Sequence, residues 1–228
     1  MSTQSFYSWY HTQVVLIEVN KQIRDVYVVV YDPKKFIKVL EILDKYGIKV
    51  RGVDANTKSI HGIIIVDDGG RQYLASNSVD VYGYIIDIDE WGFEKGLASA
   101  IVFAKTSIIR PLMNIIVGID YGKSIGIAII VNSDIVYTNS YRSKENALKD
   151  IKFFIENVDT QIKIIRIGIA SNLEDAFIDT LIDTFRDIAS IELVPEHKSS
   201  KLRHFIDRQR LKADEVAAIN IALYRGNS

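Results

Sequence analysis

The sequence contains no cysteine, and its 228 residues include only four histidines, three prolines and two methionines. The absence of cysteine excludes disulfide bonds, thiolate metal sites and a cysteine nucleophile. We expect no histidine-rich zinc site, because none of the histidines lie at ligand spacing; they are His11, His61, His197 and His204. The scarcity of cysteine and methionine, with heavy use of isoleucine, lysine and tyrosine, suits a thermophile.

Long apolar runs are also missing. No window of 18 residues is continuously apolar, and stretches such as 125–131 have only strand length, so the sequence predicts no membrane span. Residues 1–10 lack a basic region followed by an apolar run, and we therefore expect no secretory signal and a cytoplasmic location. Hydrophobic residues make up 48% of the chain, which is enough to bury a core.

The charge is nearly balanced overall, with a formal net charge of −1 at pH 7, but it is unevenly distributed. The segment 198–212 is strongly basic and contains the single acid Asp207; its basic residues are Lys198, Lys201, Arg203, Arg208, Arg210 and Lys212. A local basic block on a near-neutral chain is typical of one surface that binds an anionic partner. A solvated helix face would give the same pattern.

The first half of the chain has the pattern of a small α/β domain, which we place at residues 1–110. Runs of β-branched residues predict strands at 13–19, 26–31, 48–53, 61–66 and 82–88. A helix is expected after Pro33, with Asp32 as its N-cap, and another at 90–105. The segment 67–70, Asp-Asp-Gly-Gly, predicts a turn. The acids at 87–90 are typical of residues that cap a helix or face solvent, so no chemistry is assigned to this domain.

The second half, after a boundary predicted near Pro111, has a clearer order. Strands are predicted at 115–119, 125–131 and 135–141, joined by turns too short for anything but antiparallel neighbours. Helices and strands then alternate, with strands at 162–169 and 191–194. The resulting order, β-β-β-α-β-α-β-α, predicts a mixed sheet with helices on both faces.

Three segments of this second half resemble motifs of one nuclease superfamily. Residues 117–128, Val-Gly-Ile-Asp-Tyr-Gly-Lys-Ser-Ile-Gly-Ile-Ala, resemble the opening motif of ribonuclease H-like nucleases. Residues 194–200, Val-Pro-Glu-His-Lys-Ser-Ser, and 212–218, Lys-Ala-Asp-Glu-Val-Ala-Ala, resemble the strand-end and final-helix motifs of the group containing RuvC resolvases and the YqgF family. The resemblance covers about residues 114–226 and implies a ribonuclease H-like domain there.

The resemblance implies a metal-dependent nuclease that acts on branched DNA or structured RNA. Phosphodiester hydrolysis with two Mg²⁺ or Mn²⁺ ions needs carboxylates converging from separate elements, and such hard ions prefer oxygen ligands. Asp120, Glu196 and Asp214 occupy the acidic positions of the three motifs and are the expected catalytic metal ligands. Glu215 would replace Asp214 as the metal ligand if the final helix were rotated about its axis. Lys123 and the basic block at 198–212 are expected to bind the phosphates of the nucleic acid.

Small residues fit the same interpretation. Gly122 and Gly126 are expected to keep the hairpin open, so that a sugar-phosphate backbone can approach closely. Ala217 and Ala218 follow Asp214 at i+3 and i+4, and their small side chains are expected to let the final helix lie close to the sheet.

Two other functions are compatible with the sequence. A non-catalytic nucleic-acid-binding or scaffolding module would keep the fold and the basic block without cleaving. An ATPase of the actin-like group also has Asp-x-Gly on a hairpin, but it needs two such domains and a second phosphate loop, and we find neither in the sequence. A four-way junction as substrate would predict a homodimer, since two strands must be cut, whereas a monomer favours RNA processing.

Overall fold

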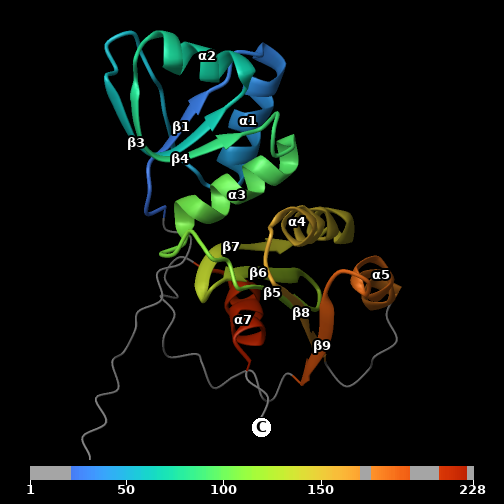
Figure 1. The fold of residues 1–228 in the computed structure, drawn as a ribbon. Helices are drawn as coiled ribbons and strands as arrows, with labels where there is room; N and C mark the ends of the chain where they lie inside the picture. The colour runs from blue at the N-terminus through green and yellow to red at the C-terminus, as the bar shows by residue number, and fades with distance from the viewer. Residues whose placement is uncertain (1–21, 170–175, 196–210, 225–228) are drawn as a thin grey trace, which may run out of the picture.

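The computed structural model describes residues 22–169, 176–195 and 211–224, and these residues form a mixed α/β fold with two sheets (Figure 1). The first sheet is entirely parallel, with strand order β2-β1-β3-β4. Its strands are β1 (Val26–Val29), β2 (Val50–Arg51), β3 (Ser59–Val66) and β4 (Asp80–Asp87). No helix in these ranges is long and apolar enough to cross a membrane.

Three helices accompany this sheet: α1 (Pro33–Lys45), α2 (Asp68–Ser76) and α3 (Phe93–Lys105). The predicted start of α1 is confirmed, because the Asp32 carboxylate accepts hydrogen bonds from the backbone N–H groups of Lys34 and Lys35 at 2.8 and 2.9 Å. An acid at this position satisfies donors that have no partner inside the helix. The helix ends before Gly47, which has a φ of 68°.

The turn predicted at 67–70 is wrong, because these residues begin helix α2. The Asp67 carboxylate caps the helix by accepting from the N–H of Gly70 at 2.8 Å. Gly70 is needed for close packing rather than for a turn, since a Cβ there would lie 1.6 Å from the carbonyl oxygen of Val29. Glycine allows backbones to approach closely as well as to turn.

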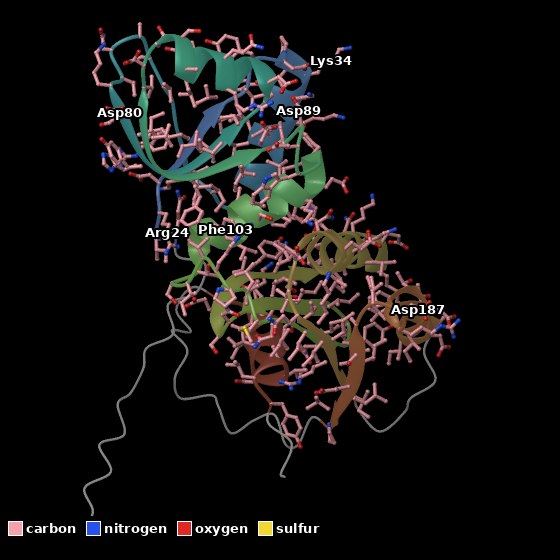
Figure 2. All side chains as sticks on the ribbon, in the orientation of Figure 1. Arg24, Lys34, Asp80, Asp89, Phe103 and Asp187 are labelled. Atoms are coloured by element: carbon pink, nitrogen blue, oxygen red, sulfur yellow. The ribbon has the colours of Figure 1, made fainter. Side chains whose placement is uncertain are left out.

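Helix α3 lies between the two halves of the chain, below the first sheet and above strand β7 (Asp134–Tyr141) and helix α4 (Lys144–Asn157) (Figure 1). Every residue from Gly96 to Lys105 is buried, as expected for a helix covered on all sides. At the end of α3, Arg24 donates to the carbonyl oxygen of Phe103 at 2.7 Å and to that of Ser107 at 2.9 Å (Figure 2). This cation compensates carbonyl groups that lack partners at a helix C-terminus.

The second sheet has strand order β7-β6-β5-β8-β9. Its strands are β5 (Asn114–Tyr121), β6 (Ile125–Val131), β7 (Asp134–Tyr141), β8 (Ile162–Ile169) and β9 (Ser190–Pro195). The first three are antiparallel neighbours, and β8 and β9 continue the sheet in parallel from β5. With helices α4 (Lys144–Asn157), α5 (Ala176–Phe185) and α7 (Ala213–Ala222), the described elements follow the predicted order of strands and helices.

A buried carboxylate connects the two halves. Asp150 of α4 is fully buried and accepts hydrogen bonds from the hydroxyls of Tyr46 at 3.0 Å and Tyr137 at 3.3 Å. The Tyr141 hydroxyl and the Lys45 ammonium group also donate to it. Burial raises the pKa of Tyr137 from its ordinary value of 10.0 to about 12, so this phenol keeps its proton well into the alkaline range. The end of α1 is thereby held against α4 and β7 by hydrogen bonds as well as apolar contact.

Helix α7 packs unusually close to the second sheet, on the face opposite α4 (Figure 1). A Cβ on Gly118 of β5 would lie 2.1 Å from the carbonyl oxygen of Ala218 and 2.7 Å from the Cβ of Ala222. A Cβ on Gly126 of β6 would lie 2.1 Å from the carbonyl oxygen of Asp214. The glycines let the helix backbone rest directly on the sheet, and Ala218 at this contact agrees with the predicted use of small residues.

Replacing Gly118 by alanine tests this contact. We expect Gly118→Ala to lower the free energy of unfolding by about 1–3 kcal/mol, since a methyl group must displace helix backbone rather than a flexible side chain. The matched control is Gly52→Ala, where a Cβ would meet nothing within 4 Å. Urea unfolding of both variants checks the prediction, and equal stabilities would contradict the packing described here.

The burial of Lys105 can be tested by the pH dependence of the protein's stability. Its side chain is 4% exposed and its ammonium group donates to the carbonyl oxygen of Tyr46 at 2.6 Å. Burial lowers the pKa of Lys105 to about 8, so the folded protein releases this proton at lower pH than the unfolded chain, whose value is 10.5. The stability of the native chain relative to Lys105→Met should therefore rise between about pH 8 and pH 10 in urea unfolding, whereas a constant or falling difference would contradict the assignment.

Candidate functional site

Three strands place polar and small residues in one row on the face covered by α7. Asp120 of β5 pairs with Gly126 of β6, and Gly126 pairs with Ser140 of β7. Residues paired directly across strands share a face, and neighbouring strands lie about 4.8 Å apart. Asp120, Gly126 and Ser140 therefore follow one another across the sheet, with the glycine in the middle.

Helix α7 places its first acid above the centre of this row. The Cβ atom of Asp214 lies 3.0 Å from the position that a Cβ on Gly126 would occupy. Since Cβ atoms of paired residues are about 4.5–5.5 Å apart, the Cβ atoms of Asp120 and Asp214 are less than about 9 Å apart. Two acids from distant motifs thus meet at one place, and both are partly exposed.

The Asp214 carboxylate is held by two serine hydroxyls. Ser140 donates to its Oδ2 atom at 3.0 Å, and Ser124, in the hairpin turn immediately before β6, donates to the same oxygen. From the sequence, we assigned neither serine a role. A signal for Ser140 existed: Thr138 and Ser140 alternate along β7 and so place hydroxyls on one face.

Glu215, the alternative metal ligand, lies toward β7. It is 7% exposed and accepts a hydrogen bond from the Thr138 hydroxyl at 3.3 Å. Burial raises the pKa of Glu215, and the neighbouring charge of Asp214 acts in the same direction, while Lys212 opposes the shift. The first turn of α7 therefore faces the sheet with Asp214 above Gly126 and with Glu215 above Thr138.

Of the residues predicted to bind nucleic acid, Lys123 and Lys212 lie within the described ranges. Lys123 is exposed in the β5–β6 hairpin, and Lys212 is exposed at the N-cap of α7. The remaining predicted site residues lie outside the described ranges; they are Glu196, Lys198, Lys201, Arg203, Arg208 and Arg210.

The role predicted for Gly126 is wrong. Its open face is filled by the backbone of Asp214, and so it admits the helix rather than a sugar-phosphate backbone. Gly122 differs, because it is exposed and a Cβ there would meet only the carbonyl oxygen of Ser124, at 3.8 Å. Of the two glycines, Gly122 alone keeps the space that was predicted for a ligand.

Oxygen is the donor atom throughout the cluster formed by Asp120, Asp214, Ser124 and Ser140. Two carboxylates backed by hydroxyls suit a hard divalent ion such as Mg²⁺ or Mn²⁺. Among residues 22–169, 176–195 and 211–224, no group of three or more His, Cys, Asp or Glu side chains is placed to hold a metal ion. The third ligand predicted from the sequence, Glu196, lies outside these ranges.

A second group of acids lies at the carboxyl ends of β3 and β4. Asp67 accepts from the N–H groups of Tyr31 and Asp32, in addition to capping α2. Asp87 accepts from the N–H of Asp89 at 2.9 Å and forms an ion pair with Arg71 at 2.7 Å. Because these carboxylates are engaged by backbone groups and by a cation, we assign them a structural role. Asp67 caps α2, whereas Asp87 is buried and does not cap α3, whose N-cap is Gly92.

A pocket of about 440 Å³ lies where α3 meets the segment between the two sheets, away from the row formed by Asp120, Gly126 and Ser140. The Arg110 guanidinium lies 5.4 Å from the ring centre of Trp91 at its wall. Lys95 and Asp159, also on the wall, form an ion pair at 3.6 Å. Two of its charged groups, Lys95 and Asp159, are thus paired with each other, and we do not place the candidate site there.

Comparison with known proteins gives little guidance. No protein-family model and no curated protein matches the chain. One solved structure with a weak likeness is a protein of unknown function with an actin-like ATPase fold from Bacteroides thetaiotaomicron. It is 8% identical, the match covers 70% of this chain and 74% of that chain, and the TM-score is 0.27. A likeness at this level does not establish a shared fold.

Proposed function

We propose that this chain is a divalent-metal-dependent nuclease that cleaves branched DNA or structured RNA. The proposal rests on one observation: Asp120 and Asp214, selected from separate sequence motifs, meet at Gly126. Asp120 pairs with Gly126 across the sheet, Asp214 packs directly on Gly126, and two serine hydroxyls hold Asp214 in that position. The resemblance to ribonuclease H-like nucleases assigns metal binding to these same two acids.

The order of elements gives further support. The resemblance implies a ribonuclease H-like domain over residues 114–226, with three antiparallel strands followed by alternating helices and strands. Strand β5 is central in the second sheet, and Asp120 lies near its end, where α7 begins. Strand β9 ends at Pro195, immediately before the third predicted acid.

The chemistry assigned to the residues follows from their position. A bound Mg²⁺ or Mn²⁺ ion would activate water and stabilise the leaving oxygen of a phosphodiester. Asp120 and Asp214 would hold the ion, with Glu196 as the proposed third ligand. Lys123 and Lys212 are exposed on the two segments that carry these acids, and they would attract the phosphate backbone of the nucleic acid.

A non-catalytic nucleic-acid-binding module is the second candidate. It is favoured by the fact that the described ranges bring two acids together rather than three. Such a module would bind in a salt-sensitive way and would not cleave with any divalent ion. Replacing Asp120 by alanine would then leave binding unchanged or tighter, because a charge that repels phosphate is removed.

Cleavage assays with Mn²⁺ separate the two candidates. The substrates are a four-way junction, a flap, a duplex, single-stranded DNA and precursor ribosomal RNA. We expect Asp120→Asn and Asp214→Asn each to reduce cleavage by more than about 100-fold, since even second-shell changes at metal sites cost about 10- to 100-fold. Asp187→Asn, an exposed acid beyond the end of α5, is the matched control and should cleave normally (Figure 2).

Cleavage that survives both substitutions would exclude the proposed site. Absence of cleavage by the native chain on all substrates, together with salt-sensitive binding, would favour the binding module. If the four-way junction is the preferred substrate, a homodimer is expected, because two strands must be cut.

A further inference from the structure

We infer that Ser124 and Ser140 are positioning residues that orient the Asp214 carboxylate for metal binding. The inference rests on the proposed function, since it concerns the same metal site. Neither serine needs to touch the ion. Their role would be to hold one carboxylate oxygen, so that the other is presented to the ion in a fixed direction.

Both hydroxyls bind the same atom, Oδ2 of Asp214. Asp214 is partly exposed, and water could satisfy its carboxylate without either serine. The two hydroxyls are therefore not required to compensate burial. Their physical effect is to restrict the rotation of the carboxylate, because hydrogen bonds to a charged group are stronger than those between neutral groups.

The position of Ser140 determines the direction in which the carboxylate is held. Ser140 lies on one side of Gly126 in the row and Asp120 lies on the other, while Asp214 is above Gly126. The Ser140 hydroxyl on the β7 side and the Ser124 hydroxyl in the β5–β6 hairpin both hold Oδ2. The other oxygen, Oδ1, is left for an ion, and an ion shared with Asp120 would bind between the two acids.

Ser140 is itself held in place by its neighbour. Tyr141 follows it on β7 and points to the opposite face, where its hydroxyl donates to the buried carboxylate of Asp150. Asp150 also accepts from Tyr46 and Lys45 of the first half of the chain. The end of β7 is thus fixed on one face by the junction between the halves, and it offers a hydroxyl to Asp214 on the other.

Binding of Mn²⁺ alone, measured by titration calorimetry on the full chain, tests this inference without relying on cleavage. We expect Ser140→Ala and Ser124→Ala each to weaken Mn²⁺ affinity by about 10-fold, within the range known for second-shell groups at metal sites. Ser140→Thr and Ser124→Thr keep the hydroxyl and should retain native affinity. Ser143→Ala controls for stability, because it removes the N-cap of α4 without touching Asp214.

The outcomes separate failure of the inference from failure of the proposed function. If the alanine variants bind Mn²⁺ like the native chain while Asp120→Asn and Asp214→Asn do not, the serines are not positioning residues but the metal site stands. If Ser143→Ala weakens binding as much as Ser140→Ala, or if the threonine variants fail to retain affinity, the inference is also overturned. If the aspartate variants bind Mn²⁺ like the native chain, the metal site and the inference are both excluded.

Discussion

The close contact between helix α7 and the second sheet is the constraint on which the candidate site depends. The helix backbone rests against Gly118 and Gly126 at distances that leave no room for a Cβ atom. Any other residue at either glycine would move the helix outward, and Asp214 with it. The same contact explains why a final segment distant in sequence adds a carboxylate to the end of β5 rather than to the protein surface.

The remainder of the fold supports this arrangement from the opposite face. Helix α4 covers that face of the sheet, and its buried Asp150 gathers donors from β7 and from the end of α1. A buried carboxylate without hydrogen-bond donors would be very costly in free energy, so Asp150 can be buried here only with these donors beside it. The first half of the chain therefore contributes to the site indirectly, by fixing the strand that carries Ser140.

Sequence periodicity was sufficient to predict the mixed α/β fold and the antiparallel arrangement of β5 to β7, whereas Asp120 and Asp214 were singled out by the resemblance to ribonuclease H-like motifs. Prediction from the sequence failed at glycines whose role could be read in more than one way. The Asp-Asp-Gly-Gly segment begins α2 instead of forming a turn, and Gly126 faces helix backbone instead of a ligand. A glycine that allows a turn or the approach of a ligand cannot be told in the sequence from one that allows close backbone packing, because each role requires the absence of a Cβ atom. Ser140 escaped notice because its alternation with Thr138 indicates a shared face but does not identify its partner, Asp214.

The most direct test of the central claim is a crystal structure of the full chain soaked in MnCl₂, analysed by anomalous scattering. The account predicts an anomalous peak between Asp120 and Asp214, with a carboxylate oxygen of each within about 2.5 Å, as hard-ion coordination requires. A peak bound by other residues, or two carboxylates that diverge with no ion between them, would contradict it.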